Sequence, residues 1–87
     1  MARFELRFKA SVVRDLRGIP QADVRRILDR IETLRDEPRP AGSVKLSAQE
    51  RYRLRQGNYR ILYTIADAEV VVEIVKIGHR REVYRDP

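Results

Sequence analysis

The chain contains no cysteine and only one histidine among its 87 residues. Without thiols there is no disulfide framework, no thiolate nucleophile and no cysteine-ligated zinc site, and a single histidine cannot build a histidine-rich metal site. These absences disfavour most metal and thiol chemistry. We therefore expect neither a metal ion nor a cofactor.

Long apolar runs are also missing. No stretch approaches the roughly 20 apolar residues that a membrane-spanning helix needs. Residues 1–5 lack the apolar core of a signal peptide. We expect a cytoplasmic protein with no membrane partner. A length of 87 residues suits one domain over residues 1–87, with a thin core.

Positive charge is abundant but unevenly placed. The net charge is +6, of which residues 51–60 contribute +4 and residues 76–85 contribute +3, which leaves −1 for the rest. A basic surface concentrated in this way suits a polyanion, whereas a surface that serves only solubility intersperses its charges. An ordinary solvated face is the alternative, since sixteen arginines to three lysines can also reflect genome composition.

The first elements predicted are a strand and a short helix. Residues 3–9 alternate charged and apolar side chains, which is the period-two pattern of a half-buried strand. From Ala10 the apolar spacing becomes helical, with either Val12 or Val13 on the inner side. Gly18 ends this helix.

A second helix follows. Pro20 suits its first position, and the helix extends to about Asp36 because Pro38 and Pro40 prevent a further turn. Its apolar stripe at 3–4 spacing consists of Val24, Ile27, Leu28, Ile31 and Leu34. We expect two antiparallel helices joined at Gly18, each packing its apolar stripe on the elements that follow.

The second half of the chain is β-prone. Val44–Leu46 suits a short edge strand, and Ser47–Glu50 a loop. After a turn at residues 66–69, Val70–Ile77 predicts the last strand, and Gly78 opens a polar tail. Together with a central hairpin, these elements predict an α+β fold with the order βααβββ, plus one extra short strand if Val44–Leu46 pairs. The sheet would be small and mostly antiparallel.

The central hairpin determines which side chains share a face. A two-residue turn at Gly57-Asn58 would join Arg51–Gln56 to Tyr59–Ile65, with Arg55 opposite Arg60. Strand alternation points six side chains toward the helices: Tyr52, Leu54, Tyr59, Ile61, Tyr63 and Ile65. The opposite side, which we name the arginine face, carries Arg51, Arg53, Arg55 and Arg60 together with Leu62 and Thr64.

Such a face works against folding stability. Like charges directly opposite each other on a sheet cost up to about 1 kcal/mol per pair. A bound phosphate backbone would remove the repulsion, because a guanidinium donates two hydrogen bonds to phosphate and keeps its charge at biological pH. The alternative is a solvated face whose arginine stems cover apolar sheet surface.

Three segments together resemble the RelE/ParE toxin family: the hairpin Tyr52–Tyr63, the strand Val70–Val75 and the ending Gly78–Arg85. The resemblance covers nearly the whole chain and implies a RelE-like fold in a toxin of a type II toxin–antitoxin system. RelE-type members, it implies, cleave messenger RNA in the ribosomal decoding site without metal, by attack of a ribose 2′-hydroxyl on the adjacent phosphate. ParE-type members share the fold but inhibit DNA gyrase by protein–protein contact.

The resemblance also assigns working residues. Arg51 and Arg53 match the basic strand positions, and Arg60 matches the arginine after the hairpin turn. Arg80 matches an arginine near the end of the last strand, and Tyr84 matches a tyrosine close to the C-terminus. Retention of this set favours RNA cleavage over gyrase inhibition. We expect further contacts to RNA from Arg55, Arg81, Lys45 and Lys76.

The proposed transesterification needs a base, stabilisation of charge at the phosphate and an acid for the leaving oxygen. Relatives often carry lysine at the strand positions, whereas Arg51 and Arg53 cannot act as a base. Tyr84 ranks above His79 as base, because nearby cations favour its phenolate. The alternatives are that Tyr84 only caps the sheet and that His79 only orients RNA. Arg80 would clamp the phosphate and Arg53 would stabilise the leaving oxygen, while the acid is unassigned. A ribosome that positions the substrate could contribute about 7–11 kcal/mol.

The resemblance implies three partners: the ribosome, messenger RNA and a RelB-like antitoxin that covers the basic sheet or the helices, with a heterotetramer as one assembly it allows. Two alternatives stay open. One is the gyrase inhibitor. The other is a non-catalytic nucleic-acid module, which ranks last because RNA-reading sheets usually expose aromatic side chains, whereas Tyr52, Tyr59 and Tyr63 are expected to face inward.

Overall fold

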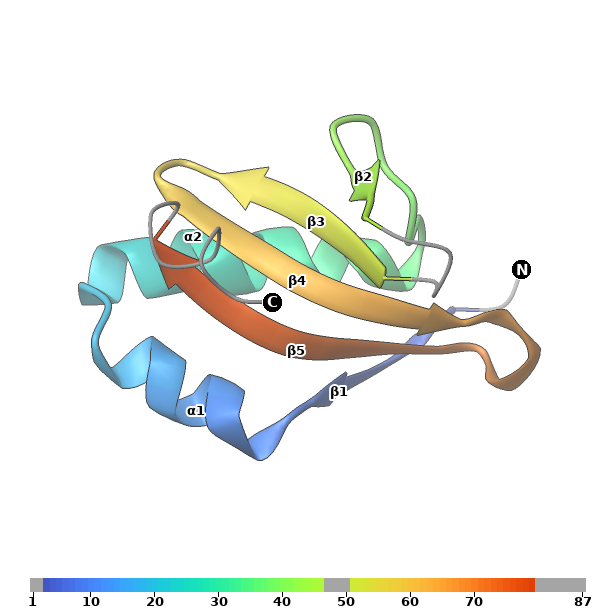
Figure 1. The fold of residues 1–87 in the computed structure, drawn as a ribbon, viewed down its shortest axis with the longest axis horizontal. Helices are drawn as coiled ribbons and strands as arrows, with labels where there is room; N and C mark the ends of the chain where they lie inside the picture. Colours follow the sequence, from blue (N-terminus) through green and yellow to red (C-terminus); the bar gives the residue numbers. More distant parts are fainter. Residues whose placement is uncertain (1–2, 47–50, 80–87) are drawn as a thin grey trace.

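The structure is a computed structural model that describes residues 3–46 and 51–79. The elements in these residues are β1 (Glu5–Phe8), α1 (Ala10–Arg17), α2 (Gln21–Glu32), the 3-10 helix η1 (Thr33–Arg35), β2 (Val44–Lys45), β3 (Arg51–Gln56), β4 (Tyr59–Ala66), the 3-10 helix η2 (Asp67–Glu69) and β5 (Val71–His79). The five strands form one sheet in the order β1-β5-β4-β3-β2 (Figure 1). β1 runs parallel to β5 and the other neighbours are antiparallel. The predicted α+β order, with its extra edge strand, is confirmed.

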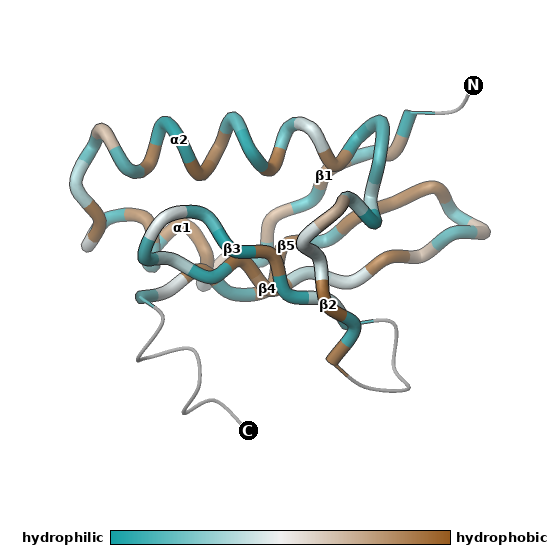
Figure 2. Tube along the Cα trace, turned by 90° about the horizontal axis from the view of Figure 1, so that it is seen from above, coloured by the Kyte–Doolittle hydropathy of each residue, from teal (hydrophilic) through white to brown (hydrophobic). Residues whose placement is uncertain are grey.

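The chain reverses direction between the two helices, and α2 lies on one side of the sheet (Figure 2). α1 packs on β5 and α2 on β3. Pro20 is not the first helical residue as predicted: its ψ of 140° is extended, so it is the N-cap, and its carbonyl accepts the N–H of Asp23 and Val24. The α-helix ends at Glu32, and only a 3-10 turn continues to Arg35. Neither helix of the described residues is long and apolar enough to cross a membrane.

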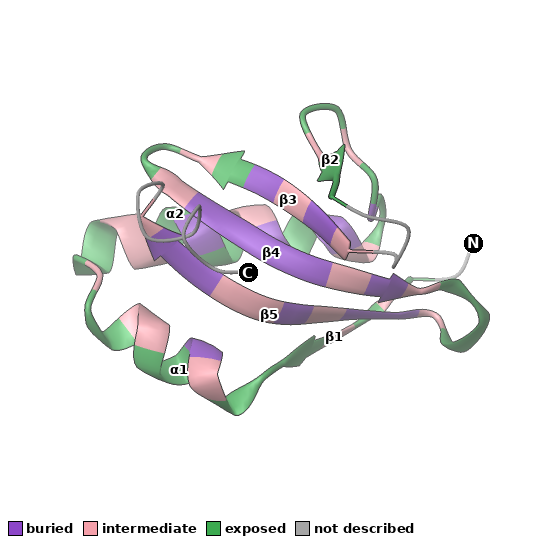
Figure 3. Ribbon diagram, viewed as in Figure 1, coloured by how far each residue is buried: buried purple, intermediate pink, exposed green. Residues whose placement is uncertain are grey.

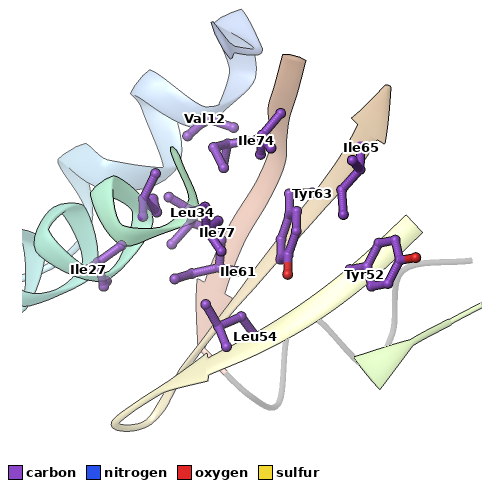
Figure 4. Packing of buried hydrophobic residues seen from close by; sticks show 12 residues of the cluster. Val12, Ile27, Leu34, Tyr52, Leu54, Ile61, Tyr63, Ile65, Ile74 and Ile77 are labelled. Atoms are coloured by element: carbon purple, nitrogen blue, oxygen red, sulfur yellow. The ribbon is translucent and has the colours of Figure 1, made fainter. Parts of the chain in front are cut away.

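The core lies between the helices and one face of the sheet (Figure 4). Of the two candidates on the first helix, Val12 is buried and Val13 is 51% exposed. Leu28, predicted in the inner stripe of the second helix, is exposed, and so is Phe8 at the end of β1. The sheet contributes Tyr52, Leu54, Ile61, Tyr63, Ile65, Val72, Ile74 and Ile77. Burying this apolar surface is the main stabilising term of the fold.

The hairpin of β3 and β4 has the predicted register, with Gln56 opposite Tyr59 and Arg55 opposite Arg60. Gly57 has φ +59°, a left-handed value that glycine adopts without a steric penalty at the first position of a two-residue turn. Along β3 buried residues alternate with more exposed ones (Figure 3), as expected of a strand with one face on the core. The predicted loop Ser47–Glu50 lies outside the described residues.

β5 departs from the prediction at both ends. Val70 does not belong to the strand but has φ +57°, and the strand begins at Val71. At the other end the strand includes Gly78 and His79, because β4 extends far enough to pair with both. A bulge interrupts the pairing of β4 with β5. Leu62 pairs with Lys76 and Tyr63 with Ile74, so Val75 is the extra residue.

The loop before β2 is tied to the sheet by Arg39. Its guanidinium donates to both carboxylate oxygens of Asp67, at 3.1 and 2.8 Å, and its Nε donates to the Tyr52 hydroxyl at 2.9 Å. The ion pair holds the pKa of Asp67 below its usual range. The buried Tyr63 hydroxyl donates to the Pro38 carbonyl at 2.8 Å, and burial raises the pKa of Tyr63 to about 12.

Candidate functional site

The arginine face consists of rows of side chains across the sheet, because residues directly opposite each other point to the same side. From the hairpin turn outward, the rows are Arg55 with Arg60 and Gly78; Arg53 with Leu62 and Lys76; and Arg51 with Thr64, Glu73 and Arg7. The first two rows carry two positive charges each and no acid. The basic character of this face is therefore concentrated toward the hairpin turn.

The members of the face differ in exposure. Arg55 is exposed, and Arg51 and Arg53 are half-buried. Arg60 is only 6% exposed, unlike the solvated side chain that an outward-facing arginine suggests. It lies on β4, the middle strand of the sheet, with β3 and β5 on either side. Because a guanidinium stays protonated at biological pH, Arg60 is a fixed cation in a partly desolvated setting, where a bound anion is worth more than in water.

The end of the face beside β1 is electrically balanced. Arg7 stands opposite Glu73 in the third row, and its Nε donates to Glu5 at 2.6 Å. The hydrogen bond and charge of Glu5 raise the pKa of Arg7, and the charges of Glu69 and Glu73 act in the same direction. Three carboxylates thus surround one arginine here, so a polyanion would favour the hairpin end.

Lys76 is on the arginine face because of the bulge at Val75. Without that extra residue, strict alternation from the buried Ile74 would turn Lys76 toward the helices and His79 toward the arginines. In the structure the phase is shifted, and Lys76 stands opposite Leu62. Lys76, which was expected to contact RNA, therefore lies on β5 on the same side of the sheet as the arginines.

Two predicted site residues lie on the other side of the sheet. His79 is opposite Tyr59, and the two rings meet edge-on with centroids 5.9 Å apart. Lys45 is opposite Tyr52 at the sheet edge. Since both partners face the helices, neither His79 nor Lys45 is brought together with the arginine face. Arg80, Arg81 and Tyr84 lie outside the described residues.

The described residues contain no group of three histidine, aspartate or glutamate side chains placed to hold a metal ion. The carboxylates at the β1 end of the arginine face are those around Arg7, and their charges act on that cation. The chemistry that this surface offers is recognition of negative charge by several fixed cations at once.

Comparison with known proteins identifies the family. A family model described as the ParE toxin of the type II toxin–antitoxin system parDE matches residues 6–84. The chain belongs to the RelE/ParE toxin family. Toxin RelG of Mycobacterium tuberculosis is 29% identical over 84 residues, which cover 94% of this chain and 97% of RelG. This toxin thus aligns with a relative along almost its full length.

Solved structures of the family have the same fold. A chain of the archaeal RelE–RelB complex from Pyrococcus horikoshii matches with a TM-score of 0.79 at 27% identity, covering 90% of the toxin and 96% of that chain. A variant of Escherichia coli toxin RelE with two arginines changed to alanine, solved in the free state, matches with a TM-score of 0.77 at 27% identity, covering 97% and 92%. The RelE-like architecture is confirmed.

Sequence reasoning missed the acidic neighbours of the arginine face. Glu73 reaches it because β5 pairs with β4, and Arg7 reaches it because β1 pairs in parallel with β5, a contact between segments far apart in the sequence. A partial signal was available: Glu73 alternates with the apolar residues of its strand and must therefore point away from the core. The pairing of Glu73 with Arg7 on β1 could not be predicted from the local sequence pattern.

Proposed function

We propose that this toxin is a ribosome-dependent, metal-independent endoribonuclease that cleaves messenger RNA in the decoding site, with the arginine face as its RNA-binding surface. The observation that carries the proposal is the direct opposition of Arg55 and Arg60, with Arg53 and Lys76 in the next row. Four cations gathered at one end of a sheet face can donate several hydrogen bonds to the oxygens of a phosphate backbone at once.

The residues of this surface would stabilise charge at the phosphate and would not transfer protons. Arg60 and Arg53 hold positive charge at every relevant pH, which suits them to the phosphate oxygens and to the leaving oxygen. His79 faces Tyr59 on the other side of the sheet, so we assign the base to Tyr84, with Arg80 as the phosphate clamp. The acid stays unassigned, and the ribosome would supply the geometry of attack.

The family likeness also suggests the partners. Several structural neighbours are complexes of RelE toxins with RelB antitoxins, among them the archaeal complex. We propose that a RelB-like antitoxin neutralises this toxin by covering its basic sheet or its helices, and a heterotetramer is one assembly it could form. Ribosomes and messenger RNA would be its targets in the cytoplasm.

The test is translation of a defined messenger by purified ribosomes, with RNA ends mapped after toxin is added. We expect cuts in the decoding site that fade with Arg53→Ala, Arg80→Ala or Tyr84→Phe. Arg25→Ala removes an equal charge from the exposed surface of α2 and should leave the cuts intact. A messenger that stays whole with the wild-type toxin would refute the proposal.

Inhibition of DNA gyrase is the second candidate, because the family model that matches residues 6–84 is described as a ParE toxin. That activity works by protein–protein contact and needs no base. Supercoiling by purified gyrase, measured with wild type and Tyr84→Phe, separates the two. Inhibition that survives the tyrosine change, with messenger left whole, would place this toxin among the gyrase inhibitors.

A further inference from the structure

Beyond Ile74, β5 has no partner strand on its β1 side among the described residues. β1 pairs with β5 only from Val71 to Ile74, and the final backbone bond of this pairing runs from the N–H of Lys9 to the carbonyl of Ile74 at 3.0 Å. β5 then continues to His79, paired with β4 alone among the described strands. The part of β5 that borders the basic end of the arginine face is therefore held by a strand on one side only.

A carboxylate from the helix layer occupies this edge. Asp15 on α1 accepts a hydrogen bond from the N–H of Ile77 at 3.1 Å, and its side chain is only 18% exposed. The contact joins residues 62 positions apart in the sequence. A charged acceptor makes a stronger bond to a backbone N–H than a carbonyl does. Beyond the end of β1, Asp15 thus supplies a hydrogen-bond acceptor for the edge of β5.

The second oxygen of the same carboxylate reaches the arginine face. Asp15 Oδ1 lies 3.9 Å from the Nζ of Lys76, whose side chain is 34% exposed. Lys76 stands opposite Leu62 in the second row of the arginine face, and its ammonium group meets a carboxylate carried by α1. One side chain therefore links the helix layer, the backbone of β5 and a cation of the candidate RNA-binding surface.

The anchor lies immediately after the bulge. A bulge breaks the regular ladder, so the strand that follows it depends on other contacts for its position. Ile77 is the second residue after Val75, and Gly78, directly opposite Arg60, comes next. β5 beside Arg60 is thus held by its pairing with β4 on one side and by the contact between Asp15 and Ile77 on the other.

We propose that Asp15 is a positioning residue of the arginine face: it anchors β5 beyond the bulge and holds the Lys76 ammonium in place for RNA. This rests on the proposed ribonuclease activity, because it describes how the surface for that reaction is kept in register. Displacement of a working group by about 1 Å can cost on the order of 100-fold in rate. A contact remote from the phosphate then has a catalytic effect.

Three variants separate the roles. Asp15→Ala removes both contacts, Asp15→Asn keeps an oxygen for Ile77 but loses the charge that Lys76 meets, and Asp29→Ala removes an exposed carboxylate from the middle of α2 as the matched control. Hydrogen exchange of the Ile77 amide, followed by NMR in the full chain, measures directly how well the hydrogen bond from Ile77 to Asp15 protects this amide. We expect exchange at Ile77 to accelerate at least about tenfold in Asp15→Ala relative to the amides of β4, and to return toward wild type in Asp15→Asn.

The rate of ribosome-dependent cleavage measures the effect of Asp15 on the positions of β5 and Lys76. We expect Asp15→Ala to lower the cleavage rate at saturating toxin by about 10- to 100-fold, with little change in the concentration that gives half the maximal rate. Asp15→Asn should recover only the part that depends on the Ile77 anchor, because it still lacks the charge that Lys76 meets. A folded Asp15→Ala protein that cleaves at the wild-type rate would overturn the positioning role. Equal exchange of Ile77 in wild type and Asp15→Ala would overturn the anchor. A wild type that cleaves nothing refutes the proposed function instead, and the exchange rates still decide the anchor.

Discussion

Replacing Arg55 by glutamine should stabilise the fold while weakening its binding to RNA. Arg55 is exposed and stands directly opposite Arg60 in the hairpin. Its one described hydrogen bond, from Nε to the Gly57 carbonyl, is long at 3.3 Å and exposed, so its loss subtracts little. Two unit charges about 5 Å apart repel by roughly 0.8 kcal/mol in water, and cross-strand pairs measure up to about 1 kcal/mol.

The expected gain is therefore about 0.5–1 kcal/mol at low salt, which corresponds to an increase of roughly 2–8 °C in Tm for a domain of this size. The assay is thermal unfolding of Arg55→Gln and wild type over a series of salt concentrations. Arg25→Gln on the exposed side of α2 is the control, since it removes the same charge far from the arginine face. Screening at about 0.15 M salt should remove about half of the difference between the two variants.

Binding should move in the opposite direction. Each phosphate contact that is lost reduces the slope of log affinity against log salt by about 0.7 for a single strand. Arg55→Gln should show this loss with a short, uncleavable RNA, and Arg25→Gln should not. A variant that is less stable than wild type at low salt, or a stability gain that salt does not change, would refute the idea that facing arginines strain this hairpin.

Three further predictions concern stability. Tyr63 has a pKa raised to about 12, above the ~10 of an unfolded tyrosine, so its contribution of about 2–3 kcal/mol to the free energy of unfolding is complete below pH 10 and disappears as the pH rises through 12. Urea unfolding across this range should show the loss of stability, and Tyr63→Phe should flatten the pH dependence. Asp67 has a pKa lowered by Arg39, so it stabilises the fold above about pH 4 and ceases to as the pH falls through its folded value; thermal melts from pH 2 to 5 should show a weaker acid dependence for Asp67→Asn, and an unchanged one would contradict the ion pair. Val70→Gly should raise Tm, because φ +57° costs a β-branched residue roughly 1 kcal/mol, and a lower Tm would indicate that the Val70 side chain packs too well to lose.

The hairpin could be predicted from sequence because its information is local. A two-residue turn with glycine fixes the register, and the register fixes which side chains share a face. For the same reason the proline-bounded helix was predicted to within a few residues. Between Val12 and Val13 the pattern could not decide, since adjacent residues both border the inner side of a helix only two turns long.

What could not be predicted depends on partners far away in the sequence. β5 includes Gly78 and His79 only because β4 reaches them, although both looked like the start of a polar tail. The bulge at Val75 shows in the sequence only as two consecutive apolar residues, Ile74 and Val75, yet it decides that Lys76 joins the arginines and His79 does not. The arginines of the candidate site could therefore be assigned from the hairpin alone. The side chains that β5 adds to the site could be assigned only from the structure.

The pairing of β1 with β5 also governs when this toxin can exist as a folded molecule. Glu5, near the beginning of the chain, is opposite Val71, which is synthesised 66 residues later. At about 5–20 residues per second, the first strand waits roughly 3–13 s for its neighbour. Contacts this distant also slow the search for the native state. Until β5 emerges there is no completed sheet, so the cell has an interval between starting a toxin molecule and meeting an active one.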